Sequence, residues 1–134
     1  MSALSDFLEN SLATAVLRGG TYTGGAVYVA LFTSNPTDAN SGVEAAWSGY
    51  ARQAAHTSAV SDGFTAPANG VSSNTKAITF PAYSGAGTTV THWGLMSAAT
   101  GGNLLMHAAL GASKTLTDTD VASFPIGSLV ATFQ

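Results

Sequence analysis

Residues 89–110 contain two apolar runs joined by a glycine-rich linker, and this pattern predicts a β-hairpin. The runs span residues 90–98 and 104–110, and Gly101 and Gly102 lie between them. Glycine reaches positive φ without a Cβ clash, so paired glycines between strand-like runs are a strong hairpin signal. Both runs are apolar on both faces, which is typical of central strands covered on both sides. We therefore expect a tight hairpin, centred on these glycines, in the middle of a sheet.

Other short runs indicate further strands. Residues 26–33 carry β-branched and aromatic side chains on both faces and predict another central strand. Shorter strands are expected at 50–60, 76–82, 114–116, 121–124 and 129–133, between turns rich in glycine, proline and asparagine. Seven or eight short strands with glycine-rich links favour an all-β fold: an antiparallel, sandwich or jelly-roll-like single domain.

The N-terminal residues 3–18 predict an amphipathic helix. One apolar stripe is formed by the leucines at positions 4, 8 and 12 together with Ala15 and Val16. Ser5 or Ser2 is the candidate N-cap, and Gly19-Gly20 ends the helix. We therefore divide the chain into a helix and hinge (1–20) and a β-sandwich domain (21–134). A helix of this length is marginal alone. We expect it to dock on its own sheet, and docking on a neighbouring subunit is the alternative.

The composition favours a single domain with an unusually neutral surface. The chain has 134 residues and no cysteine, so it has neither disulfides nor cysteine-based zinc sites. Charged residues make up 8% of the chain, against about 25% in a typical domain. A weakly charged surface is poorly protected against self-association. It is either covered by neighbours in an assembly or simply coated by Ser and Thr.

The charge pattern argues against nucleic-acid and membrane partners. Four basic residues are scattered along the chain, whereas phosphate binding needs a basic cluster: Arg18, Arg52, Lys76 and Lys114. No apolar run approaches the ~20 residues that span a bilayer. Asp6 and Glu9 lie where a signal peptide would be basic. We expect a protein made in the cytoplasm of its host cell without a cleaved signal.

The candidate catalytic and metal-binding residues are few. If His107 lies opposite Met96 in a tight hairpin, His92 is four residues further along, about 13 Å away, which is too far to share an ion. Asp118 and Asp120 indicate a polar turn, and no nucleophile elbow or phosphate loop is present. The sequence predicts no metal site, no cofactor and no enzyme activity.

Five segments occur in an order that is similar to a known family: VYVALFTSNPTDANSG, GYARQ, AITFPA, VTHWGLMSAATGGNLLMHAAL and SFPIGSLVATF. They resemble small virion proteins of tailed bacteriophages, which are labelled head decoration (cement) proteins or, in some cases, tail fibre proteins. The resemblance covers nearly the whole chain, and the ATGGNLL turn is its most specific part. It implies a structural virion protein without catalytic residues.

The resemblance implies a capsid decoration protein on the outer surface of the head, bound to the phage major capsid protein. Such proteins usually form homo-oligomers, with a trimer favoured. The partner-contact candidates lie in the loops and the helix: Trp47, Tyr50, Arg52, Phe64, Phe7 and Leu8. The alternative is a tail fibre or tail-associated module that binds a host receptor or adaptor, with Trp47, Tyr22 and Tyr83 stacking on sugars. A polysaccharide hydrolase with Asp62 and Asp118 as its carboxylate pair ranks last.

Overall fold

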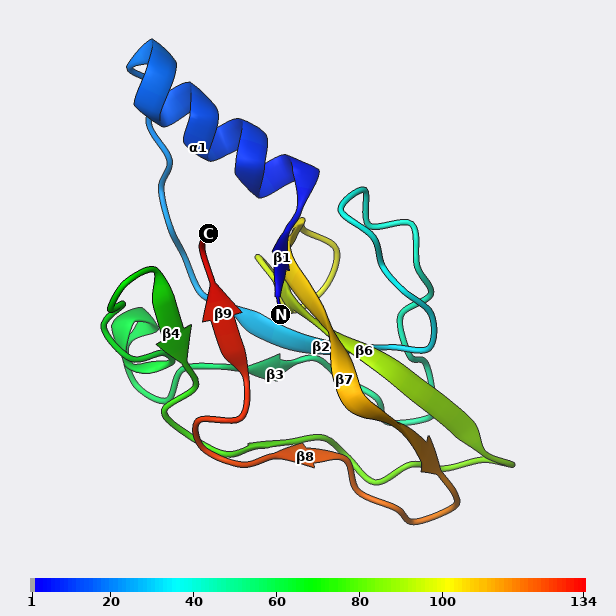
Figure 1. Ribbon diagram of the computed structural model, residues 1–134. Helices are drawn as coiled ribbons and strands as arrows, with labels where there is room; N and C mark the ends of the chain where they lie inside the picture. Colours follow the sequence, from blue (N-terminus) through cyan, green and yellow to red (C-terminus); the bar gives the residue numbers. More distant parts are fainter. Residues whose placement is uncertain (1) are drawn as a thin grey trace.

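Antiparallel strands in two layers enclose the core, and a single α-helix extends from one side (Figure 1). The structure is a computed structural model that describes residues 2–134. One layer is a five-stranded sheet with the strand order β1-β7-β6-β2-β3, and the other consists of the strand pairs β4–β9 and β5–β8. This arrangement confirms the predicted all-β, sandwich-like fold with an N-terminal helix.

The elements follow one another in this order: β1 (Ala3–Leu4), α1 (Asp6–Arg18), β2 (Tyr28–Phe32), β3 (Gln53–Ala54), the 3₁₀ turn η1 (Val60–Asp62), β4 (Val71–Ser73), β5 (Ile78–Thr79), β6 (Thr88–Met96), β7 (Leu104–Leu116), β8 (Ser123–Phe124) and β9 (Val130–Thr132). The two longest strands, β6 and β7, are those of the predicted hairpin, and β6 occupies the middle of the five-stranded sheet. Within residues 2–134, no helix has the length and apolar character needed to cross a membrane.

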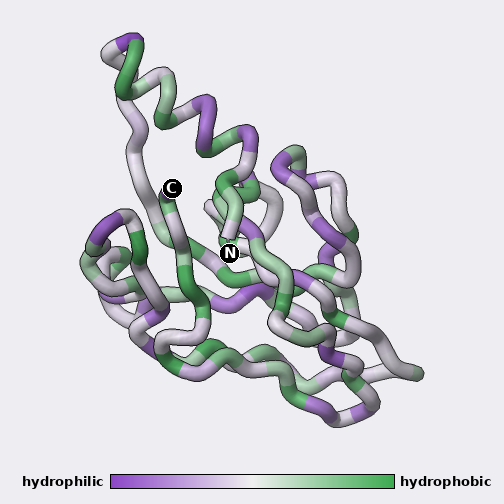
Figure 2. Tube along the Cα trace, viewed as in Figure 1, coloured by the Kyte–Doolittle hydropathy of each residue, from purple (hydrophilic) through white to green (hydrophobic). Residues whose placement is uncertain are grey.

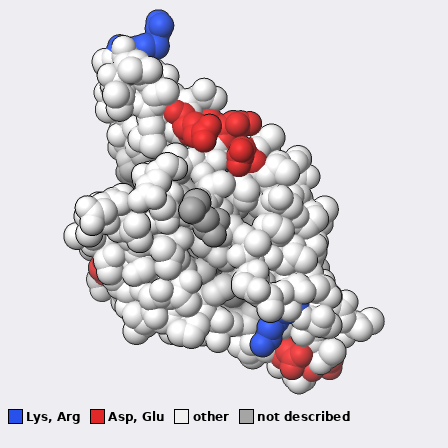
Figure 3. All heavy atoms as spheres, in the orientation of Figure 1, with Lys and Arg blue, Asp and Glu red and all other residues white. Residues whose placement is uncertain are grey.

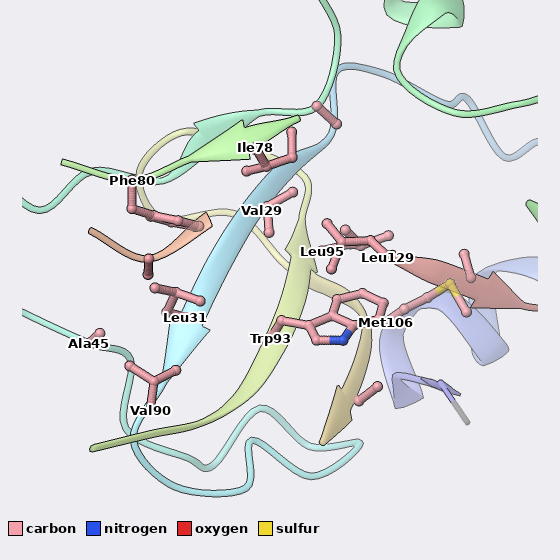
Figure 4. Close-up of a cluster of buried hydrophobic side chains, with 14 of the residues drawn as sticks. Val29, Leu31, Ala45, Ile78, Phe80, Val90, Trp93, Leu95, Met106 and Leu129 are labelled. Carbon is pink, nitrogen blue, oxygen red and sulfur yellow. The ribbon is translucent and has the colours of Figure 1, made fainter. Parts of the chain in front are cut away.

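The main core lies between the two layers (Figure 4). Val29 and Leu31 of β2 lie near Ile78 and Phe80 of the second layer, and Leu95 of β6 lies beside Leu129. All six are at most 5% exposed. Alternation along β2 and β6 places these side chains on one face. Full burial of one such side chain stabilises the fold by about 1.5–3 kcal/mol. The burial of this set is therefore what holds the two layers together.

The opposite face of the sheet carries a second, smaller cluster. Ala30 and Phe32 of β2 pack with Met96 and Leu104 of the hairpin, and all four are buried. The predicted two-sided burial of the 26–33 run is therefore confirmed for residues 29–32, whereas residues 26–28 and 33 are partly buried. Gly94 belongs to this packing, because a Cβ added there would lie 2.8 Å from Phe32 Cε2.

The register of the hairpin differs from the prediction. Met96 pairs with Leu104, so the chain reverses over residues 97–103 rather than in a tight turn, and a register irregularity follows Leu95. As a result His107 lies opposite Gly94, not Met96. His92 and His107 are then diagonal neighbours on one face, roughly 7–8 Å apart at Cα, and the expected 13 Å separation was wrong.

Three predicted element boundaries were also wrong. The helix begins at Asp6, because Ala3–Leu4 pairs with β7 as strand β1. In the expected strand 50–60, only Gln53–Ala54 is paired, because the chain then turns around the Asp62 carboxylate, which accepts backbone N–H groups of residues 57–59. The expected separate strand 114–116 is the end of β7, which continues through an irregularity opposite residues 90–92.

Candidate interaction surface

Helix α1 is fixed to the sheet at its first turn. The Ser5 hydroxyl accepts the Leu8 N–H at 3.2 Å and donates to the Leu104 carbonyl of β7. The Ser5 N–H also donates to the Leu105 carbonyl at 2.9 Å. Of the two candidate N-caps, Ser5 is therefore the cap, and these bonds set the direction in which the helix leaves the sheet. Gly19, with φ 66°, ends the helix in the left-handed conformation.

The helix leaves the body of the protein along its length (Figure 1). Leu8 is 4% exposed and Leu12 packs partly against the core, whereas Val16 and Leu17 are 79% and 80% exposed. Figure 2 shows a hydrophobic segment at this outer end of the helix. We call residues 5–27, the helix and the returning chain, the arm. The expectation that the helix docks on its own sheet holds for its first half only.

An apolar groove of about 430 Å³ runs between the arm and the sandwich. Its walls come from helix α1, from residues 22–27 of the returning chain, and from the ends of β4, β6, β7 and β9. Phe7, Leu12, Tyr22, Phe64 and Phe133 contribute large side chains, and none of the lining residues is charged. We call this the arm groove. Because its lining is apolar, it suits an aliphatic or aromatic occupant.

The few charges on the arm are separated along its axis. Asp6 and Glu9 lie in the first turn of helix α1 and are exposed, and Arg18 lies in the last turn. Figure 3 shows acidic groups near the base of the arm, a basic group at its outer end, and further charged groups together at the lower right, with mostly uncharged surface between them. The arrangement complements the helix dipole and gives the two ends of the arm opposite charge.

A second cluster forms where loop 34–49 meets the hairpin. Arg52 donates from Nε and Nη2 to the two Glu44 carboxylate oxygens at 2.8 and 2.7 Å. Its Nη1 donates to the Ala98 and Gly101 carbonyls at 2.8 and 2.7 Å. The bond to Glu44 raises the pKa of Arg52. All three guanidinium nitrogens are thus used within the chain, and the Arg52 side chain is 10% exposed.

Tyr50 belongs to the same cluster. Its hydroxyl accepts the Leu31 N–H of β2 at 3.0 Å and donates to Glu44 Oε1 at 3.0 Å. Burial raises the pKa of the Tyr50 phenol far above its ordinary value, and Glu44 adds to the increase. Tyr50 and Arg52 therefore fix loop 34–49 and the 97–103 turn to the sheet.

Trp47 anchors the same loop through aromatic contacts. Its ring lies edge-on to Tyr50 at 4.8 Å and to Tyr83 at 5.4 Å between centroids. Tyr83 is 8% exposed, so the expectation that it stacks on a sugar was wrong. Tyr22, the third aromatic of that expectation, lines the arm groove instead. The three rings do not form one binding platform.

The structure divides the six predicted contact residues into two groups. Trp47, Tyr50 and Arg52 form the loop cluster just described, and the other three line the arm groove: Phe7, Leu8 and Phe64. Leu8 is buried in the core, whereas Phe7 is 41% exposed. Sequence reasoning placed Val16 on the apolar stripe with Leu8, but it did not identify the exposure of Val16 and of the adjacent Leu17. A partner contact at any of the six stays a prediction.

The two hairpin histidines have separate hydrogen-bond partners. His107 Nε2 lies 2.9 Å from Asp38 Oδ1, and His92 Nδ1 lies 2.8 Å from Thr91 Oγ1. Burial, and secondarily the nearby His107, lowers the pKa of His92. Among residues 2–134, no group of three or more His, Asp or Glu side chains is placed to hold a metal ion.

The comparison with known families covers nearly the whole chain. The model of one family, described as podophage GP4 fiber I protein gp80, matches residues 3–132. No curated protein matches the sequence. The match includes the arm, the hairpin and the second layer, and it bears out the resemblance to phage virion proteins. The chain therefore belongs to the podophage GP4 fiber I protein family and is a virion-associated structural protein.

Proposed function

We propose that the chain is a subunit of a virion fibre, in which it acts as a structural and binding module. The observation that carries this proposal is the match of residues 3–132 to a family described as a fiber I protein. The architecture supports it, because the sandwich has a well-buried core and leaves the exposed aliphatic tip of the arm and polar loops at its surface. These two surfaces suit assembly with other subunits and recognition of a host receptor or adaptor.

A role in recognition needs loops with a fixed conformation. The loop cluster of Trp47, Tyr50 and Arg52 fixes the conformation of the loops around it. Arg52 and Tyr50 fix residues 44–52 and the 97–103 turn through hydrogen bonds to Glu44, to backbone carbonyls and to the Leu31 N–H. Preorganised loops lose less entropy on binding than mobile ones. The exposed polar residues that surround this cluster are the recognition surface that we propose.

The second candidate is capsid decoration, with the phage major capsid protein as partner and a trimer as the assembly. It is favoured by the compact shape of the chain, which has a single sandwich and no long shaft in residues 2–134 (Figure 1). The shape of a single sandwich is compatible with binding to a capsid surface and with forming the end of a fibre. We rank the fibre first, because the family whose model matches residues 3–132 is described as a fiber I protein.

We also propose that the protein is not an enzyme. Glycoside hydrolysis needs one carboxyl group that stays protonated as a general acid. The Asp62 carboxylate instead accepts the backbone N–H groups of residues 57–59, and these bonds lower its pKa to about 2. Asp62, one of the two carboxylates that the hydrolase hypothesis names, is therefore a poor proton donor near neutral pH.

Copy number and position in the virion distinguish the two locations. Purified virions would be quantified by mass spectrometry against the major capsid protein, and antibodies to the chain would be imaged on particles by electron microscopy. A fibre subunit should be present in few copies and be labelled at the tail. Label spread over the head, with copies in proportion to the capsid protein, would refute the fibre and support decoration.

A further inference from the structure

The apolar stripe of helix α1 continues beyond the part that its own sheet covers. Leu8, Leu12 and Val16 are four positions apart and share one helix face. Leu8 is buried in the core, whereas Val16 and the adjacent Leu17 are almost fully exposed. No other large apolar side chain identified as exposed in residues 2–134 is as accessible as this pair. The outer end of the arm therefore presents aliphatic surface that its own domain leaves uncovered.

The arm groove has the complementary chemistry. Its lining is apolar and carries no charge, so a charged occupant would lose hydration without gaining a partner. The tip of the same arm cannot fill it, because the helix carries Leu17 roughly 13 Å along its axis from Leu8 at 1.5 Å per residue. The tip of a second copy supplies exposed aliphatic side chains, which suit this lining.

The charges on the arm determine the direction of this contact. Asp6 and Glu9 at the base and Arg18 at the tip are all exposed. Antiparallel helices bring the base of one arm beside the tip of the other, which pairs opposite charges, whereas parallel helices would pair like charges. With Leu12 of both copies at the centre, Leu17 of one copy lies near Phe7 of the other.

We propose that two copies exchange arms about a two-fold axis, each inserting Val16 and Leu17 into the arm groove of the other. The contact is isologous, so it joins copies in pairs. Arg18 of each copy then faces Asp6 and Glu9 of its partner. The inference rests on the proposed assembly into a virion structure, because it supplies one of the subunit contacts, but it concerns the purified chain and not its location on the particle.

The first test measures the mass of the purified protein by sedimentation across a wide range of concentration. We expect a monomer–dimer equilibrium that weakens about 10,000-fold when Val16→Gln and Leu17→Gln are combined, because the two-fold contact then loses four aliphatic side chains, two from each copy, at about tenfold each. Ile126→Gln is the matched control, because Ile126 is 68% exposed but lies outside the arm. Circular dichroism would verify that each variant is folded. A strict monomer, a trimer without dimers, or a tip variant that associates like wild type would overturn the proposal.

The second test uses the absence of cysteine from the chain. Copies carrying Phe7→Cys and copies carrying Leu17→Cys would be mixed and oxidised. We expect a disulfide-linked pair that contains one copy of each, and little linkage when Ile126→Cys replaces Leu17→Cys. Equal linkage in the two mixtures would refute the antiparallel contact. If both tests fail but antibodies label the tail, the arm exchange is refuted and the fibre assignment stands. If both tests succeed but the label covers the head, the arm exchange stands and only the location on the virion is refuted.

Discussion

Arg52 Nη1 donates a 2.7 Å hydrogen bond to the Gly101 carbonyl, joining two loops that are 49 residues apart in the chain. Gly101 lies in the 97–103 turn with φ 61°. The same guanidinium holds both oxygens of Glu44. One side chain therefore links loop 34–49 to the hairpin that organises the sheet.

Replacing Arg52 with alanine should destabilise the protein by about 2–3 kcal/mol, because Glu44 loses its ion pair and two turn carbonyls lose a donor. Arg52→Lys should recover only part of this, since an ammonium group cannot bind Glu44 through two parallel bonds. Urea unfolding of both variants measures the effect. A cost below about 0.5 kcal/mol for Arg52→Ala, the usual range for surface changes, would contradict the linking role.

Asp62 should make stability depend on acid pH. The backbone N–H groups of Thr57, Ala59 and Ser58 lower its pKa from 3.8 to about 2 in the folded state. The stabilisation is therefore complete above pH 3.8 and is lost as the pH falls towards about 2. Thermal unfolding across this range should show a smaller loss for Asp62→Asn than for wild type.

The matched control for this prediction is Asp118→Asn, the same substitution at an exposed aspartate elsewhere in the chain. The control should follow the wild-type curve. An Asp62→Asn curve as steep as wild type in acid would show that other groups carry the pH dependence.

The apolar pattern of the hairpin was sufficient to predict its place in the sheet but not its register. Strand character and two-sided burial depend on the local residue pattern, here an apolar run on both faces, which is visible in residues 90–96 and 104–110. The register depends on how the turn closes. Here the Ser97 N–H donates to the Asn103 carbonyl, and the Ser97 hydroxyl accepts the Asn103 N–H, both at 2.9 Å. Residues 97–99 have no property that marks them as turn rather than strand.

The candidate site was predictable only where local spacing determines it. The helical stripe identifies Leu8, Leu12 and Val16 as one apolar face, but it does not reveal that the sheet ends before Val16 and leaves that side chain exposed. The stripe also includes Leu4, and this led to the wrong helix start, because pairing of β1 with β7 decides that boundary. The contacts of Arg52 with Glu44 and Gly101 join distant segments, so no spacing in the sequence reveals them.

Gly94 should be intolerant of even one methyl group. An alanine Cβ would lie 2.8 Å from Phe32 Cε2 and 2.9 Å from Leu104 Cδ1, inside the smaller core cluster. Overpacking of this kind costs typically about 1–3 kcal/mol. Gly111→Ala in β7 is the control, because its Cβ would meet no atom within 4 Å. Equal unfolding midpoints for the two variants would mean that the cluster repacks without cost.

Leu8 and Leu17 lie on the same helix and should affect different properties. Leu8 is 4% exposed in the main core, so Leu8→Ala should cost about 2–5 kcal/mol of monomer stability. Leu17 is 80% exposed, so Leu17→Ala should change monomer stability by less than about 0.5 kcal/mol. Unfolding at low concentration, where the monomer prevails, measures both changes. If Leu17→Ala destabilised the monomer as much as Leu8→Ala, the arm tip would have to be covered by its own domain in solution. The separation of the two effects therefore tests whether the outer half of helix α1 serves assembly rather than folding.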